Sequence, residues 1–355
     1  MSQHNDNCPF NWDNWPDILP GPDPGGGEEE QTWDEISASL EKEALWRDAK
    51  NGIVSAQLEL GVNLSFGENG FEKNPQEAVK WLGAAAKQGD PDAQGCLAYC
   101  LEHGIGCQKN PTKAFKLYRA AAEQGEMSAQ FCLGRCFWDG IGCKKNPKKA
   151  VRWFRAAAKQ WEDNAQNYLG YCLQHGIGCK KNPEKAFRWY RAAAKQGNSA
   201  GQNNYAFCLE HGIGCKKKPR KAVRLFRAAA KQGELTAQSN YAFCLRDGIG
   251  CKKNPRKAFR LFRAAAKQGN DCGQSNYAYC LEFGIGCKKN PDKAVRWFRA
   301  AAKQGNLTAQ YNLAYCLENG IGCPEDIDKA LYWYRKAAAQ GDEDAQWALR
   351  RLGKQ

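Results

Sequence analysis

The sequence lacks any long apolar run. No stretch of its 355 residues approaches the roughly 18 apolar residues that a membrane-spanning helix needs, so we expect no transmembrane segment. The first residues, MSQHNDNCPFNWDNWPD, contain neither a basic segment nor an apolar run of signal-peptide length. These absences predict a cytoplasmic protein, with leaderless secretion as the alternative.

A recognisable catalytic motif is also missing. We find no acid/base pair, nucleophile elbow or phosphate-binding loop outside a repeated pattern, and the glycines of the GIG segments recur as helix stops. We therefore expect no enzymatic activity, no catalytic residue and no cofactor.

Acidic residues are scarce outside the N-terminal part of the chain. Residues 1–50 carry 12 Asp and Glu against 3 Lys and Arg, whereas the rest has a net charge of +23 and the whole chain +14. Residues 1–33 include PDILPGPDPGGGEEE, which cannot bury enough apolar surface to fold, so we predict a disordered acidic tail there. The basic body favours an anionic partner, and this tail is one candidate.

Cysteine, by contrast, is abundant and periodic. The chain has 18 cysteines, and those of its GIGC loops recur every 36 residues from Cys107 to Cys323. Periods of about 20 to 50 residues are typical of solenoids, in which each repeat buries its apolar face only against its neighbours. The period therefore predicts a repeat protein.

Each repeat has the pattern of two helices. In NPKKAVRWFRAAAKQ, Asn146 is a good N-cap and Pro147 suits the first helical position, and apolar residues follow on one side of a 3.6-residue helix. A second helix is expected in LTAQYNLAYCLENG, with Gly320 as its stop. We predict an all-α fold of helix-turn-helix repeats, divided into a tail (1–33), an N-terminal capping helix (34–52), eight repeats (53–341) and a C-terminal capping helix (342–355).

The motif AQ…LA/G…GxG…KA…WF/WY…AA…G at this period resembles the Sel-one-like repeat (SLR) family, which is related to tetratricopeptide repeats. The resemblance covers residues 34–355 and implies helical hairpins stacked in a right-handed superhelical solenoid with scaffold or adaptor roles. The chain departs from the family at the loop position after GIG, where it has Cys and the family usually has Val.

Seven repeats contain two cysteines seven positions apart, and the first repeat lacks both. The candidate pairs are Cys100 with Cys107, Cys136 with Cys143, Cys172 with Cys179, Cys208 with Cys215, Cys244 with Cys251, Cys280 with Cys287, and Cys316 with Cys323. Because a repeat has either both cysteines or neither, we expect the two cysteines of a repeat to be in contact. The two thiols either fill a buried site as small apolar side chains or form a disulfide in each repeat.

Metal binding is a third reading of these cysteines. Cys96, Cys100, His103 and Cys107 have residue types that suit zinc. Only two further repeats have histidine at this position, His175 and His211, and the other four have Asp, Phe or Asn, so we expect no metal site.

One residue of each first helix is expected to point away from its partner helix, and the resemblance places it in the concave groove. These residues are Tyr99, Arg135, Tyr171, Phe207, Phe243, Tyr279 and Tyr315, and a neighbouring amide column contains Asn204, Asn240, Asn276 and Asn312. Rings give contact area at low entropy cost, so these positions are candidates for binding a peptide or a partner domain. Packing between adjacent repeats is the alternative for the rings.

The second helices carry a basic triad opposite their apolar side. The five triads are Arg152, Arg155 and Lys159; Arg188, Arg191 and Lys195; Arg224, Arg227 and Lys231; Arg260, Arg263 and Lys267; and Arg296, Arg299 and Lys303. This basic band is either a solvated face that keeps the protein soluble or a surface for nucleic acid, acidic protein or membrane headgroups.

We therefore predict a monomeric, non-enzymatic scaffold or adaptor that binds a protein partner in its groove. Nucleic-acid or anionic-surface binding through the basic band is the alternative.

Overall fold

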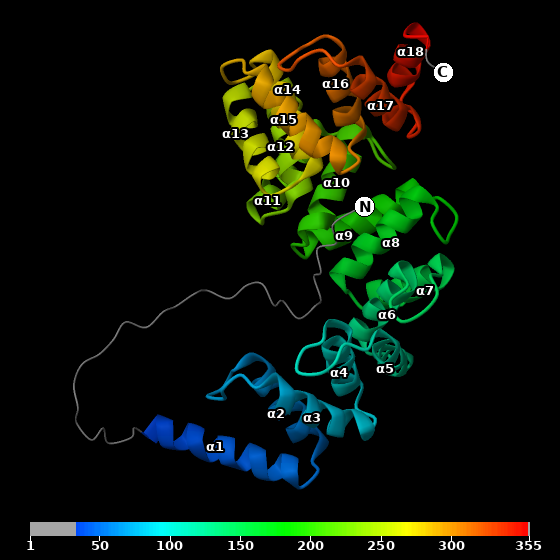
Figure 1. The fold of residues 1–355 in the computed structure, drawn as a ribbon. Coiled ribbons are helices and arrows are strands. Elements are labelled where there is room, and N and C mark those ends of the chain that lie inside the picture. The colour runs from blue at the N-terminus through cyan, green and yellow to red at the C-terminus, as the bar shows by residue number, and fades with distance from the viewer. Residues whose placement is uncertain (1–32, 354–355) are drawn as a thin grey trace, which may run out of the picture. The chain divides into compact units, whose positions relative to one another are not determined.

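The computed structural model describes residues 33–353, and within that range the regular structure consists of 18 α-helices and no strand (Figure 1). Apart from Trp33, the predicted acidic tail lies outside the described residues. None of the helices in this range is long and apolar enough to cross a membrane.

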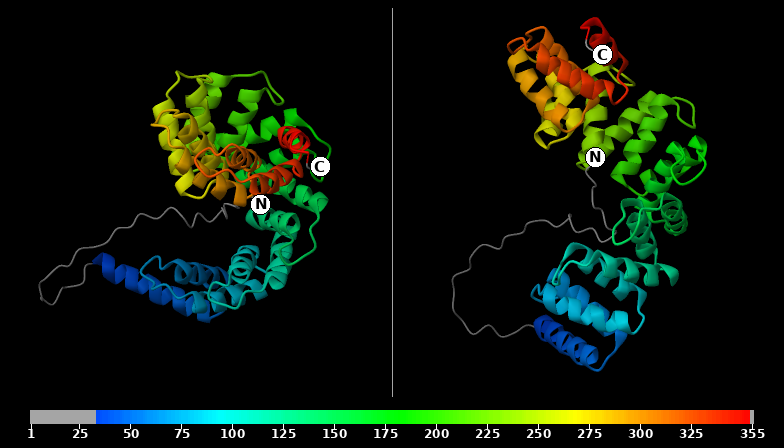
Figure 2. Two further views of the ribbon diagram at one scale, coloured as in Figure 1. Left: turned by 45° about the horizontal axis from the view of Figure 1, so that its top comes forward. Right: turned by 45° about the vertical axis from the view of Figure 1, so that its right-hand side comes forward.

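The chain divides into two compact units, residues 1–182 and 183–355. Within each unit every described helix packs against the next one along the chain, and Figure 2 shows these hairpins from two further directions. Unit 1 contains α1 (Trp33–Lys50), α2 (Val54–Phe66), α3 (Pro75–Lys87), α4 (Pro91–His103), α5 (Pro111–Glu123), α6 (Met127–Asp139), α7 (Pro147–Lys159) and α8 (Asp163–His175). Unit 2 contains α9 (Pro183–Lys195), α10 (Ser199–His211), α11 (Pro219–Lys231), α12 (Leu235–Asp247), α13 (Pro255–Lys267), α14 (Asp271–Phe283), α15 (Pro291–Lys303), α16 (Leu307–Glu318), α17 (Ile327–Ala338) and α18 (Glu343–Arg351).

From α2 to α17 the even-numbered helices are the first, or A, helices of the repeats, and the odd-numbered helices are the second, or B, helices. Helix α7, a B helix, begins as the sequence predicts. Asn146 accepts a hydrogen bond from the Lys149 backbone N–H at 3.0 Å, and Pro147 is the first residue of α7. Ala150, Val151 and Phe154 on the apolar side are buried.

In most repeats two glutamines tie the helices together, whereas Gln268 donates to the Ala264 carbonyl instead. In unit 1, Gln124 Nε2 donates to Gln94 Oε1 at 3.1 Å and to the Gly89 carbonyl of the preceding repeat at 3.1 Å. Unit 2 repeats the pair, since Gln304 Nε2 donates to Gln274 Oε1 at 2.9 Å. The second glutamine of a repeat therefore bonds the first helix of the same repeat, and at Gln124 it also bonds the preceding hairpin.

The second glycine of each GIG loop contacts the preceding repeat. In unit 2, Gly214 has φ +66°, and a Cβ added there would lie 2.3 Å from the carbonyl oxygen of Pro183, the first residue of α9. Only glycine allows the loop to approach that backbone so closely while holding a positive φ.

Candidate functional site

The strongest candidate surface is a column of four rings on the A helices of unit 2. The exposed fractions are 36% for Phe207, 38% for Phe243, 37% for Tyr279 and 42% for Tyr315. Each ring lies between a buried alanine and a buried cysteine, so its position on the helix is fixed by core packing. Helix α12 contacts both α10 and α14, so the rings of Phe207, Phe243 and Tyr279 belong to neighbouring helices.

Side chains one turn further along the A helices extend this ring column. Phe207 stacks on His211 with ring centroids 4.1 Å apart, and Tyr279 packs on Phe283 at 4.6 Å. The guanidinium of Arg246 lies 4.4 Å from the centroid of Phe243 and 5.6 Å from that of Tyr279. Arg246 therefore links the rings of α12 and α14 through cation–π contacts.

The asparagine column of unit 2 is half-buried, and part of its hydrogen-bonding capacity is already used. Asn240 Nδ2 donates to Asn203 Oδ1 at 2.9 Å. Asn276 Nδ2 donates to the Cys272 carbonyl at 2.9 Å, while its Oδ1 accepts from Arg246 at 3.3 Å. These bonds hold the amides in fixed orientations beside the rings.

Unit 1 continues the pattern incompletely. Tyr171 is 41% exposed, whereas Tyr99 is half-buried and packs on His103. Arg135 is buried, because it reaches back to Glu102 of the preceding repeat at 3.4 Å. In the described structure Arg135 is therefore an internal ion-pair partner, which a comparison of equivalent positions alone did not indicate.

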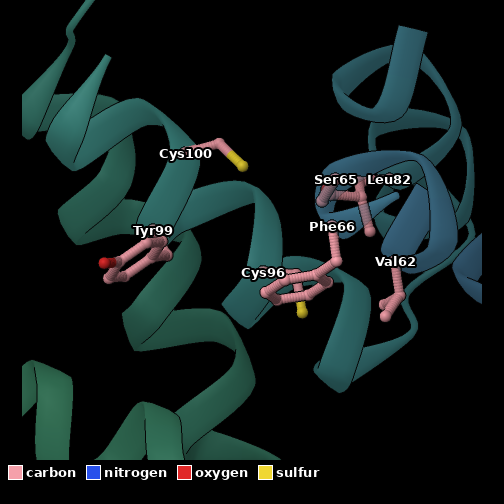
Figure 3. A pocket seen from close by; sticks show the side chains of 7 residues that line it. All are labelled: Val62, Ser65, Phe66, Leu82, Cys96, Tyr99 and Cys100. Atoms are coloured by element: carbon pink, nitrogen blue, oxygen red, sulfur yellow. The ribbon is translucent and has the colours of Figure 1, made fainter. Parts of the chain in front are cut away.

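A small hollow adjoins Tyr99 in unit 1, with side chains of α2 and α3 on one side and of α4 on the other (Figure 3). Its lining consists of Val62, Ser65, Phe66, Leu82, Cys96, Tyr99 and Cys100. Ser65 donates its hydroxyl to the Gly61 carbonyl at 2.7 Å. The lining includes no carboxylate, imidazole or amine, so the hollow suits an apolar side chain rather than acid/base chemistry.

All fifteen residues of the predicted basic band are exposed. Twelve of them are in unit 2, on α9, α11, α13 and α15. Among residues 33–353, no carboxylate forms an ion pair with any of the fifteen. Their charge is thus uncompensated by close contacts within the described chain.

The structure places the two cysteines of a repeat close together, and within residues 33–353 no disulfide joins them. The helix cysteine is buried and the loop cysteine is half-buried. In unit 2, the loop thiol of Cys215 lies 3.4 Å from the carbonyl oxygen of Cys208, and Cys287 lies 3.3 Å from that of Cys280. Burial, and then the neighbouring loop thiol, raises the pKa of Cys208 to about 12. At neutral pH the helix cysteine is therefore a protonated thiol.

Within residues 33–353, no three side chains of the ligand types His, Cys, Asp and Glu lie close enough to share a metal ion. The string that contains Cys96 and His103 is thus not gathered into a site. His103 instead packs on Tyr99, with ring centroids 4.3 Å apart.

Three further residues were not among those predicted from the sequence: Arg246, Phe283 and Trp161. Arg246 links two rings of the column, while Phe283 and Trp161 are 56% and 70% exposed. Phe283 could have been found from the sequence, because it is the equivalent of His103 in its own repeat and lies one turn after the ring column. Trp161 could have been found from the sequence, because it replaces the glycine that follows Gln at the end of the other repeats.

Consecutive helical hairpins with a 36-residue repeat define an all-α repeat solenoid. The Sel1 repeat model matches eight successive segments, and the chain belongs to the Sel1 repeat family. The matched segments are residues 54–90, 91–126, 128–160, 163–198, 199–234, 235–270, 273–306 and 307–342. Proteins built from Sel1 repeats generally mediate protein–protein interaction and are typically non-catalytic scaffolds.

Two solved structures support the assignment. One is c5321, a protective antigen present in uropathogenic Escherichia coli strains that displays an SLR fold; it is 30% identical, with a TM-score of 0.61 over 90% of this chain and 77% of that one. The other is a Sel1 repeat protein from Oxalobacter formigenes, 32% identical, with a TM-score of 0.63 over 69% of this chain and 96% of that one. No curated protein sequence matches this chain.

Proposed function

We propose that the chain is a non-enzymatic scaffold that binds a protein partner on the A-helix face of unit 2. The observation that carries this proposal is the column of Phe207, Phe243, Tyr279 and Tyr315, whose rings remain 36 to 42% exposed although their immediate neighbours are buried. Large rings in fixed positions are typical of the residues that supply most of the binding free energy at protein interfaces.

The chemistry of the surrounding side chains supports a peptide or a partner domain as the bound species. Asn240 and Asn276 are amides that can donate to and accept from a main chain. Arg246 adds a guanidinium that contacts two rings and is paired with Asp247 at 2.9 Å. Rings with fixed amides beside them provide both apolar contact and register for a bound segment.

The test compares two triple variants of the full chain. The ring variant carries Phe207→Ala, Phe243→Ala and Tyr279→Ala; the matched control carries Arg224→Ala, Arg260→Ala and Arg296→Ala on the B helices. Partners captured by the unchanged chain are identified, and one is purified for affinity measurement. We expect the ring variant to lose at least tenfold in affinity, because three truncated anchors cost more than about 1.4 kcal/mol together, while the control keeps its affinity. Equal affinity of the ring variant and the unchanged chain would reject the proposal, provided that both have the same helical content.

Binding of nucleic acid or another anionic surface by the basic band is the second candidate. It is favoured by the twelve exposed Arg and Lys residues of unit 2, none of which is ion-paired within residues 33–353. A phosphate backbone would displace counterions along such a surface, so affinity for RNA or DNA should fall steeply as salt rises.

Gel retardation at low salt discriminates this candidate. We expect the Arg224→Ala, Arg260→Ala, Arg296→Ala variant to bind more weakly and with a shallower salt dependence than the unchanged chain. A chain shortened to residues 33–355 that binds more tightly than the full chain would show that the acidic segment competes for the band. No retardation of either chain would remove the candidate.

A further inference from the structure

The seven cysteine pairs are identical sites that neither fold class nor partner binding explains. In five repeats the loop thiol lies 3.3 to 3.8 Å from the carbonyl oxygen of the helix cysteine: Cys143, Cys215, Cys251, Cys287 and Cys323. The same seven-residue separation recurs at Cys100 with Cys107 and at Cys172 with Cys179. The loop therefore brings its sulfur back to the last turn of the A helix each time.

Two glycines set this geometry. In the repeat of Cys208, Gly212 has φ +77° and ends α10, and Gly214 has φ +66° and rests on Pro183. These two positions turn the chain so that Cys215 faces the helix end. The backbone of the loop thus brings the Cys215 thiol to Cys208, the residue that carries the other thiol of the repeat.

The two thiols of a pair differ in access. Cys208 is buried, whereas Cys215 is half-buried and near the cation of Lys218, which counteracts part of the effect of burial on its pKa. A small disulfide in solution can therefore reach the loop thiol first, and the helix thiol is placed to resolve the product.

We propose that each pair is a dithiol oxidation site that glutathione disulfide, or a similar small disulfide, converts into a disulfide within the repeat. The Cys215 thiolate attacks one sulfur of glutathione disulfide, forms a mixed disulfide and releases one glutathione. The Cys208 thiol then loses its proton to solvent and attacks the Cys215 sulfur, which displaces the second glutathione. Two protein thiols are oxidised and one glutathione disulfide is reduced to two glutathione molecules.

The paired cysteines differ in sequence spacing from the other cysteines of the repeats. Cys96, Cys132 and Cys272 have no cysteine seven positions further along the chain. A purely space-filling role would leave the paired thiols reduced in the folded protein, as it would Cys132, which is also buried.

The test uses the full folded chain, equilibrated with glutathione disulfide, quenched in acid, unfolded, alkylated and digested with trypsin without reduction. Residues 196–216 form one tryptic peptide whose only cysteines are Cys208 and Cys215. We expect this peptide without an alkyl group and about 2 Da lighter than the dithiol form, because one bridge removes two hydrogen atoms. In the next repeat trypsin cuts after Arg246, so peptides 232–246 and 247–252 should be recovered joined through Cys244 and Cys251.

The matched control is Cys215→Ser, which removes one loop thiol and keeps a side chain of similar size. We expect Cys208 of this variant to be alkylated after unfolding, while the pair Cys244 and Cys251 remains bridged. Cys251→Ser provides the reciprocal control should Cys215→Ser fold poorly. Full alkylation of both cysteines in peptide 196–216 of the unchanged chain would overturn the proposal, and so would glutathione retained on Cys215.

Discussion

Trp161 occupies a position where the other seven repeats have glycine. Its φ is +74°, in the left-handed region, and its side chain is 70% exposed. A residue with a Cβ is strained in this conformation by roughly 1 to 2 kcal/mol, and little packing offsets that strain here.

The strain at Trp161 gives a residue-scale prediction. Trp161→Gly should raise the free energy of unfolding by about 0.5 to 1 kcal/mol, because the relief of strain exceeds the greater chain entropy of glycine. Trp161→Ala keeps the Cβ and should show no comparable gain. Chemical denaturation measures both, and equal stability of the two variants would contradict the assignment of strain to the backbone.

Glu162 gives a second residue-scale prediction, because it is a buried N-cap of α8. Its carboxylate accepts from the Ala165 N–H and, at 3.2 Å, from Asn164 Nδ2, yet burial raises its pKa to about 7. Between pH 4.5 and 7 the folded state retains a proton that the unfolded state releases, so this group's contribution to stability falls as pH rises through that window.

The comparison with Glu162→Gln isolates this effect, since the amide keeps an acceptor oxygen and does not titrate. From pH 4.5 to 7.5 the unchanged chain should lose about 2 to 3 kcal/mol relative to the variant. If the unfolding free energies of the two chains changed with pH in parallel, the raised pKa of Glu162 would be refuted.

At the scale of the element, we expect the close contact of Gly214 with the preceding repeat to affect stability more than its left-handed φ does. Gly214→Ala would put a Cβ 2.3 Å from the Pro183 carbonyl oxygen, whereas nothing lies within 4 Å of a Cβ at Gly233, which has φ +89°. We expect Gly214→Ala to destabilise by roughly 3 kcal/mol or more and Gly233→Ala by about 1 kcal/mol. Thermal unfolding of the two variants measures the difference, and equal losses would show that the loop does not rest on the preceding repeat.

Bridging of the cysteine pairs has its own element-scale consequence. A disulfide between Cys208 and Cys215 closes a loop of eight residues, which in the chain-entropy model stabilises the folded state by about 2.5 kcal/mol. The oxidised chain should therefore unfold at a higher temperature than the reduced chain, and Cys215→Ser should lose part of that gain. A lower unfolding temperature on oxidation would indicate that the bridge strains the loop.

The sequence predicted helices better than it predicted contacts between them. The cap at Asn146, Pro147 and the apolar side of α7 depend on neighbours within one helix, so periodicity and capping rules suffice. The burial of Arg135 depends on Glu102, 33 positions earlier, and no local rule reveals such a partner. The glutamine hydrogen bonds were visible only as recurring letters, since their partners come from the fold.

At the scale of the whole molecule, two surfaces of different chemistry recur along the repeats. Arg152 and its equivalents on the B helices present charge, whereas Phe243 and its equivalents on the A helices present rings. Because each repeat offers the same side chains, a partner that contacts several repeats gains affinity from many moderate contacts. We propose that the rings, rather than the charges, carry recognition of a protein.

Site-specific photo-crosslinking tests this claim most directly. Benzoylphenylalanine replaces Phe243 in one full-length chain and Arg260 in another, and each is irradiated with the purified partner identified by capture. We expect an efficient crosslink from position 243 and at most a weak one from position 260. A crosslink from position 260 alone would contradict it.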